Sequence, residues 1–328
     1  MLKIGICTAM DDTPRRRWWR RGLIAANMLP TNPHASPAEL DRFERIMAQL
    51  RLSNGTVRTT LRNRLVAVDQ KVESILTSIF PLNTNLLVED WAVSSGVTAA
   101  EWFGSLQRIY PNVTFTASDR ILYLVEVRLR DERGSFIVEP SGEPIQYIRP
   151  PFVVSMTEMQ HPVYLINRSV QRRAMRKWKD VSKHFRVPAA WEHVNGNCQT
   201  LSLDEFVFRR LPLIHPHVID IRGEYFRIKQ HNIFTVLSQP VHVIRTMNIL
   251  NRSYFTASRL QSAADAIRQS LSPSGLWIVG RTVKDNPPDH EVTVLRKTRC
   301  GWETVLRIGK GSEMESILSH GIPVTTHV

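Results

Sequence analysis

The sequence is poor in cysteine and has no long apolar run. Its three cysteines, Cys7, Cys198 and Cys300, lie far apart among 328 residues and show none of the paired spacing of a zinc site or a disulfide framework. We therefore expect a reducing, cytoplasmic compartment and no bound metal. No uninterrupted apolar stretch reaches the ~18 residues needed to cross a bilayer, so we expect no transmembrane segment. The basic N-terminal cluster is not followed by an apolar stretch, so we expect no secretory signal either.

Acidic residues are scarce relative to basic ones. The chain has 43 Lys and Arg against 30 Asp and Glu, which gives a formal net charge of +13. Such an excess favours anionic partners: nucleic acid, an anionic lipid surface, or an acidic or phosphorylated substrate. A basic surface without any such partner is an equal alternative.

Two segments concentrate this charge. The Arg15–Arg21 segment mixes arginine with tryptophan, which suits a membrane interface or nucleic acid, although a mobile arm that folds back on the domain is favoured. Gln171–Lys179 is the densest basic patch, and a solvated helix face is its ordinary interpretation.

The hydrophobic pattern predicts helices near the start of the chain. Ser36 and Pro37 have the N-cap and first-turn chemistry of a helix, and apolar residues follow at three- and four-residue spacing as far as Leu50. A second helix is predicted over residues 59–80. We interpret residues 1–81 as an N-terminal arm and a helical lid.

The stretch from Leu86 to Trp102 reads as strand, loop and helix. Leu86–Val88 is apolar, Ala92–Gly96 is a loop of small residues, and Thr98 and Glu101 have the spacing of a capping box. This order lets a backbone approach a nucleotide, with the helix N-terminus facing the ligand. Taken alone, the stretch is better explained as an ordinary turn between a core strand and a core helix.

The next predicted strand, Asn112–Asp119, ends in a carboxylate. An acidic side chain at the tip of the second strand of such a fold can accept hydrogen bonds from both hydroxyls of a ribose. A solvent-facing aspartate that caps a turn is the alternative. Residues 121–222 are too many for a plain crossover, so we expect an insertion that shapes the substrate side.

The alternation of strand and helix resumes at Tyr225. Strands are predicted at Tyr225–Ile228 and Val241–Arg245, a helix at 257–271, and a Pro/Gly turn at Leu271–Leu276 that leads into another strand. The tail predicts an antiparallel hairpin. The fold class is therefore α/β, a doubly wound, mostly parallel seven-stranded sheet with a C-terminal antiparallel hairpin, and its core comprises residues 82–120 and 223–328.

Several of these parts together resemble class I S-adenosylmethionine-dependent methyltransferases. The turn at Leu271–Leu276 is similar to their L-x-P-G-G-x-L turn, and Asp90–Gly96 is similar to their acidic-x-Gly-x-Gly-x-Gly loop, with Ala92 and Ser94 in two of the glycine places. After the fourth strand, Arg245–Leu250 followed by Tyr254 resembles the chemotaxis-receptor methyltransferases. This chain has one residue more before Asn248 and two more before Tyr254. The resemblance covers about 82–120 and 225–312.

The resemblance implies S-adenosylmethionine as the cofactor and a role for each matching residue. Asp90 would lie near the amino group, Ala92, Ser94, Ser95 and Gly96 under the methionine part, Asp119 at the ribose, Asn232 and Ile233 at the adenine, and Asn248 beside the sulfonium and methyl group. The implied activity is methyl transfer to an O or N nucleophile of an unidentified acceptor, and the basic charge favours an acidic one.

Asn248, Tyr254 and His231 are the candidate catalytic residues. A general base is needed only if the acceptor must lose a proton, and His231, His242 and Tyr254 could provide it. For His242 and Tyr254, packing in the core is the stronger interpretation. His215 and His217 have the spacing of a loop metal site, but no third ligand is evident.

Two other functions remain open from the sequence. A catalytically silent methyltransferase fold that binds a protein or nucleic acid is favoured by the missing glycines and the charge of +13. A nicotinamide-dependent dehydrogenase is disfavoured by the terminal hairpin, because a dehydrogenase sheet normally closes in parallel. The methyl acceptor and the oligomeric state are not specified by the sequence.

Overall fold

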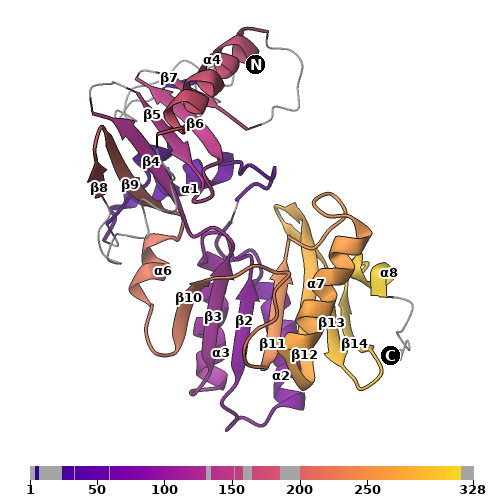
Figure 1. Cartoon of the computed structure of the whole chain (residues 1–328). Coiled ribbons are helices and arrows are strands. Elements are labelled where there is room, and N and C mark those ends of the chain that lie inside the picture. Colours follow the sequence, from indigo (N-terminus) through magenta and orange to yellow (C-terminus); the bar gives the residue numbers. More distant parts are fainter. Residues whose placement is uncertain are drawn as a thin grey trace. The chain divides into compact units, whose positions relative to one another are not determined.

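The computed structural model of the chain describes residues 4–6, 24–32, 34–58, 60–130, 134–150, 152–157, 165–184 and 200–318. The chain divides into two compact units (Figure 1). The first contains Met1–Thr59 and Ile121–Ile219, and the second contains Thr60–Arg120 and Asp220–Val328. The second unit therefore includes residues 60–81, which the sequence had assigned to the N-terminal part.

The second unit is built on a mostly parallel sheet, as the sequence predicts. Its strand order is β10-β3-β2-β11-β12-β13-β14. The strands are β2 (Leu87–Trp91), β3 (Thr114–Asp119), β10 (Phe226–Gln230), β11 (Val241–Met247), β12 (Leu271–Asp285), β13 (Pro288–Lys297) and β14 (Trp302–Ile308). The first five in this order run parallel, whereas β13 is antiparallel to β12 and to β14.

Helices cover both faces of this sheet. The helix α7 (Ala257–Ser270) and the short α8 (Met314–Leu318) pack with Trp91 and Trp277 in one buried cluster. Val88 of β2 is paired with Phe115 of β3. Val88 and Trp91 are three residues apart on one strand, so Val88 and Phe115 lie on the face of the sheet opposite Trp91. That face holds α2 (Val66–Ile79) and α3 (Val97–Ile109), because the α3 residue Trp102 packs edge-on against Phe115.

The first unit has an antiparallel sheet with helices on both faces. Its order is β1-β7-β6-β5-β4-β9-β8. The strands are β1 (Ile4–Ile6), β4 (Tyr123–Leu129), β5 (Ser135–Val138), β6 (Pro144–Arg149), β7 (Phe152–Ser155), β8 (Thr200–Leu203) and β9 (Phe206–Pro212). The helices are η2 (Ala26–Met28), α1 (Pro37–Gln49), α4 (Leu165–Val181) and α6 (Pro216–Asp220). Two buried clusters separate the layers, one with η2 and α1 and the other with α4.

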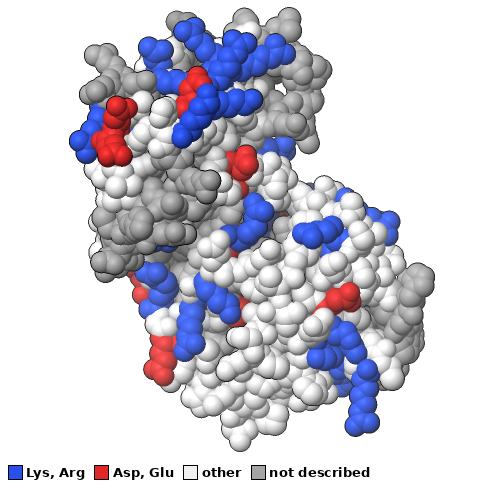
Figure 2. All heavy atoms as spheres, viewed as in Figure 1, with Lys and Arg blue, Asp and Glu red and all other residues white. Residues whose placement is uncertain are grey.

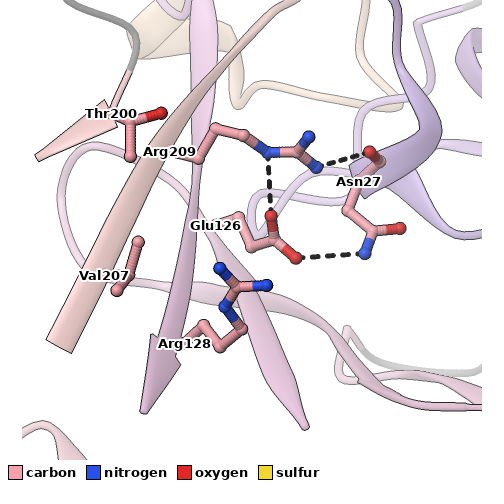
Figure 3. Close-up of a pocket in the computed structure, with 6 residues that line it drawn as sticks. All are labelled: Asn27, Glu126, Arg128, Thr200, Val207 and Arg209. Carbon is pink, nitrogen blue, oxygen red and sulfur yellow. Dashed lines mark hydrogen bonds and ion pairs between the residues drawn. The ribbon is translucent and has the colours of Figure 1, made fainter. Parts of the chain in front are cut away.

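A buried carboxylate fixes η2 to the first sheet. Glu126 of β4 accepts hydrogen bonds from Asn27 Nδ2 at 3.0 Å and from Arg209 Nε of β9 at 2.9 Å (Figure 3). Arg209 also donates to the Asn27 carbonyl at 2.6 Å. These residues line a cavity of about 200 Å³ together with Arg128 and Thr200.

Helix starts show where local signals succeeded and failed. Ser36 and Glu39 form the full capping box at α1, with proline at the start of the helix as predicted. The expected box of Thr98 and Glu101 is wrong, because α3 begins at Val97 with Gly96 as its N-cap, two residues earlier than the box requires, and no side chain caps it. Glu101 instead accepts from the Asn63 backbone N–H at 2.9 Å. α2 begins at Val66 rather than at 59, since residues 62–65 form a turn.

The expected turn before the fifth strand is an interruption within one long strand. Val241 of β11 pairs with Leu271 of β12, and Val243 pairs with Leu276, so extra residues of β12 bulge out between these pairs. Ser274 in this bulge has a positive φ of 60°. Within the described parts of the chain, no helix is long and apolar enough to cross a membrane. The Arg15–Arg21 segment lies outside the described residues.

Candidate functional site

The carboxyl ends of β2 and β11 mark the point where the order of the parallel sheet reverses. From β2 the chain adds β3 and β10 on one side, and β11 and β12 lie on the other. Ligands of open α/β sheets bind in the crevice outside the carboxyl ends of the strands at such a reversal. At this edge, Ala92–Gly96 follows β2, His231–Ile233 follows β10 and Asn248 follows β11. The strand β3 ends in Asp119 at the same edge.

The loop after β2 has an alternating left-handed backbone. Ala92, Ser94 and Gly96 have φ values of 60°, 59° and 82°. Residues with a Cβ rarely adopt this conformation, which glycine adopts without strain. The three residues occupy the glycine places of the resembled loop. Ala92 and Ser94 therefore have the left-handed backbone conformation that is usually found at glycine.

Hydrogen bonds hold this loop against the end of β3. Val93 N–H donates to the Ser118 carbonyl at 3.1 Å, and Gly96 N–H donates to the Val93 carbonyl at 3.0 Å. Ser94 N–H donates to Asp119 Oδ2 at 2.8 Å. Because these contacts come from a neighbouring strand, the unusual φ values are imposed by the fold rather than by the loop sequence.

Asp119 joins three segments at the carboxyl edge. Its side chain, 9% exposed, binds the loop through Ser94, and its backbone carbonyl accepts from His231 N–H at 3.0 Å. The loop after β2, the end of β3 and the segment after β10 thus meet at one residue, through both its side chain and its backbone.

Asp90, the penultimate residue of β2, has its carboxyl in a buried charge cluster. Arg245 Nη2 donates to Asp90 Oδ2 at 2.5 Å and to the Thr98 carbonyl at 3.1 Å, while Arg245 Nη1 donates to Asp69 Oδ1 at 2.6 Å. The guanidinium carbon also stands 4.2 Å from the centre of the Trp102 ring. Asp90 is 3% exposed and Arg245 is 1% exposed. The Asp90 carboxyl therefore has a buried internal partner, the guanidinium of Arg245.

The two carboxyls of this cluster share one guanidinium. Burial raises the pKa of Asp69 to about 7, against the opposing effect of Arg245, and burial also raises the pKa of Asp90. With both carboxyls ionised the cluster would have a net negative charge in the core, so we expect one of them to hold a proton near neutral pH. The sequence did not identify Asp69 as part of a buried cluster. Its one sequence signal is that an acidic residue stands beside Val68, on the apolar face of a predicted helix.

His231 lies against Trp91 at the end of β2. The ring centres are 4.4 Å apart, and burial, aided by nearby Lys229, lowers the pKa of His231 to about 4. Its Nε2 atom is buried and has no hydrogen-bond partner among the described residues. Trp91 Nε1 donates to Glu89, whose other carboxylate oxygen is 2.7 Å from Lys229 Nζ. Because the pKa of His231 is lowered to about 4, its imidazole is neutral at pH 7.

Asn248 follows β11 with a positive φ of 61°. Its N–H donates to the Gly280 carbonyl at 2.8 Å, and its Oδ1 accepts from Thr282 N–H at 2.6 Å. Its side chain is thus docked on β12. Asn232 is exposed and accepts from Phe234 N–H at 3.2 Å, while Ile233 is 9% exposed and belongs to the core beneath α7.

The remaining candidates are one tyrosine and two histidines. Tyr254 is 39% exposed in the turn before α7. His242 accepts from Leu87 N–H at 3.0 Å through Nδ1, a packing role as the sequence suggested. His215 is 1% exposed and meets Phe43 edge-on. Among the residues that the structure describes, no group of three or more His, Cys, Asp or Glu could hold a metal ion.

No family model matches the sequence, and no curated protein matches it. Solved structures that resemble the chain include the CMeT domain of the citrinin polyketide synthase, with 12% identity over 76% of this chain and 40% of that one and a TM-score of 0.31. LepI in complex with SAM has 11% identity over 76% and 37%, and a TM-score of 0.32. A putative sarcosine dimethylglycine methyltransferase from Galdieria sulphuraria has 8% identity over 66% and 47%, and a TM-score of 0.29. The chain spans less than half the length of these structures. Similarity this low does not establish a family.

Proposed function

We propose that this protein is an S-adenosylmethionine-dependent methyltransferase whose cofactor binds at the carboxyl edge of β3, β2 and β11. The observation that supports this best is the loop after β2. Ala92, Ser94 and Gly96 have positive φ values, and Ser94 N–H is bound to Asp119. This strained path costs about 1 kcal/mol or more at each non-glycine residue. Strain of this kind gathers at ligand sites.

The residues at this edge suit an adenosyl group. A carboxylate has about four lone-pair sites, so the bond from Ser94 is compatible with Asp119 accepting from a ribose as well. The small side chains of Ala92, Ser94 and Ser95 leave the loop backbone open to close approach. The buried, unpartnered Nε2 of His231 adds a polar atom near the same edge. Asn232 and Ile233 remain the proposed adenine contacts.

Asp90 is not part of the site that we propose. Its carboxyl binds Arg245 on the face covered by α2 and α3, where it ties β2 to β11. In this proposal Asp90 positions the loop Ala92–Gly96 through its contact with Arg245 and does not bind the cofactor.

The bound cofactor would supply a methyl group that its positive sulfur has already activated. The protein then has to hold the acceptor in line and exclude water. Asn248 lies at the edge with its side chain fixed to β12, and Tyr254 and His231 are the other proposed acceptor-side groups. Because the pKa of His231 is lowered to about 4, this imidazole is a weak base at pH 7. An acceptor that is already nucleophilic at this pH, such as a carboxylate, would need no base from the protein.

Calorimetric titration of the full chain with S-adenosylhomocysteine tests the assignment. We expect saturable binding, and we expect Asp119→Asn to weaken it at least about tenfold, since a hydrogen bond to a charged group contributes about 1.5–3 kcal/mol. Asp265→Asn is the matched control, because Asp265 is exposed on α7 and accepts only a local bond from Gln261. Absence of wild-type binding at millimolar ligand would contradict the proposal.

That negative result would favour the second candidate, a silent module with this fold. The net charge of +13 and the burial of Asp90 are the observations in its favour. Its partner would be a nucleic acid or another anionic surface.

A further inference from the structure

A groove of about 500 Å³ lies in the first unit, between α4 and strands β6 and β7. Its lining residues are Tyr147, Arg149, Phe152, Val154, Val170, Arg173, Ala174 and Lys177. The helix contributes positions i, i+3, i+4 and i+7, which form one face of α4. The strands contribute alternate residues that are paired across the ladder, Tyr147 with Val154 and Arg149 with Phe152. The groove is therefore a regular space between a helix and a sheet.

Small residues leave this space open. Further along α4, Trp178 fills the layer between helix and sheet, with its ring 5.1 Å from that of Phe136. One turn earlier the helix presents Ala174, and β7 presents Val154 opposite. These two side chains are 3% and 7% exposed, and they form an apolar floor. Phe152, 52% exposed, is a large apolar side chain on the wall.

Among the described residues, the charged side chains that line the groove are all basic. They are Arg149, Arg173 and Lys177. In the smaller cavity of this unit, by contrast, Arg209 is paired with Glu126 (Figure 3). Lys and Arg side chains also gather over the region of α4 in the space-filling view (Figure 2). On that helix, the burial pattern gives Arg172, Arg173, Arg176 and Lys179 as exposed. An apolar floor beside the cationic side chains of Arg149 and Arg173 is complementary to an anion with an apolar body.

We infer that this groove binds a small organic acid, with an acyl chain or aromatic ring on the Val154–Ala174 floor and a carboxylate at Arg149 and Arg173. The volume falls in the range of about 300–1,000 Å³ that is usual for small-molecule sites. The site does not depend on methyl transfer and lies wholly within the first unit.

A nucleic acid fits this groove less well. Binding of single strands without sequence preference uses successive exposed aromatic faces. The Tyr147 ring packs against Phe136 at 4.7 Å and has Lys177 Nζ 5.8 Å from its centre, so of the two lining aromatics only Phe152 is exposed. The buried floor matches an acyl or aryl body better than a stacked base.

The inference is tested by calorimetry on the full chain with dodecanoate and 1-naphthoate below their aggregation limits. We expect saturable binding of at least one of these acids and none of dodecyltrimethylammonium, which has the same chain with a cationic head. Arg173→Glu should weaken binding at least about tenfold, because a favourable charge becomes a repulsive one. Arg172→Glu, the same charge change on the neighbouring residue outside the groove, should stay within about twofold. Val170→Trp should abolish binding by filling the groove, and circular dichroism checks that each variant is folded.

Three results would overturn the inference. These are absence of saturable binding of both acids, equal losses in Arg173→Glu and Arg172→Glu, and unchanged acid binding in Val170→Trp. A short oligouridylate that binds wild type and Val170→Trp equally but loses affinity in both charge variants would assign the surface to nucleic acid instead.

Discussion

Replacement of Asp69 by asparagine should change how stability depends on pH. Asp69 is 6% exposed on α2 and accepts from Arg245 Nη1 at 2.6 Å. Asparagine keeps an oxygen that can accept this bond but has no proton to lose. The substitution therefore imitates the neutral carboxyl and tests whether the native cluster holds a proton.

The sign follows from the two pKa values of Asp69. The ordinary value is 3.8, and burial raises it to about 7 in the folded protein. Between these values the unfolded carboxyl is ionised while the folded one keeps its proton. The proton on Asp69 thus contributes fully to the free energy of unfolding below pH 3.8, and this contribution is lost as the pH rises towards 7. A shift of about three units corresponds to about 4 kcal/mol, of which about 2 kcal/mol falls between pH 5 and pH 7.

Urea unfolding at pH 5, 6 and 7, followed by tryptophan fluorescence, measures this change. We expect the free energy of unfolding of Asp69→Asn, relative to wild type, to rise by about 2 kcal/mol from pH 5 to pH 7. The exposed Asp265→Asn should show a difference that is flat within about 0.5 kcal/mol. If Asp69 is instead ionised in a stabilising pair at pH 7, the variant should lose about 3–5 kcal/mol there. That loss, or a difference independent of pH, would refute the shared-proton cluster.

Two further substitutions test the backbone of the second unit by urea unfolding. Ala92→Gly should leave stability unchanged or raise it by up to about 1 kcal/mol, because it relieves a φ of 60°, whereas Ala100→Gly inside α3 should cost about 1 kcal/mol. Equal losses at both positions would show that Ala92 is not strained. Gly280→Ala should cost about 2 kcal/mol or more, because its Cβ would lie 2.3 Å from the Glu291 carbonyl, while Gly104→Ala on α3 meets nothing within 4 Å and should gain about 1 kcal/mol. A Gly280→Ala protein as stable as wild type would contradict the close β12–β13 approach.

The candidate site was only partly accessible to sequence reasoning. The end of β3 at Asp119 follows from the alternation of apolar and polar residues, and the loop Ala92–Gly96 follows from its small side chains. The contact between them, from Ser94 N–H to Asp119, requires β2 and β3 to be neighbours in register. The left-handed φ values at Ala92 and Ser94 run against local preference, so only strand packing could fix them.

Asp90 shows what motif matching does not supply. The motif gives the position of Asp90 along β2 but not its side of the sheet, and the pleat of β2 turns it to the face opposite Trp91, towards α2 and α3. There it meets Arg245, which lies 155 residues away in the chain. A motif records the order of residues, whereas the side of the sheet on which a residue lies decides what it can touch.

The sequence by itself determined the features whose causes lie within a few residues. The Ser36–Glu39 capping box, the strand that ends at Asp119 and the hairpin of β13 and β14 are of this kind, because neighbouring side chains and turn chemistry specify them. The tertiary structure alone decided that α2 belongs with the parallel sheet, that Arg245 joins Asp69 and Asp90, and that α4 leaves a groove over β6 and β7. These features depend on packing between segments distant in the chain, and no local pattern encodes such pairing.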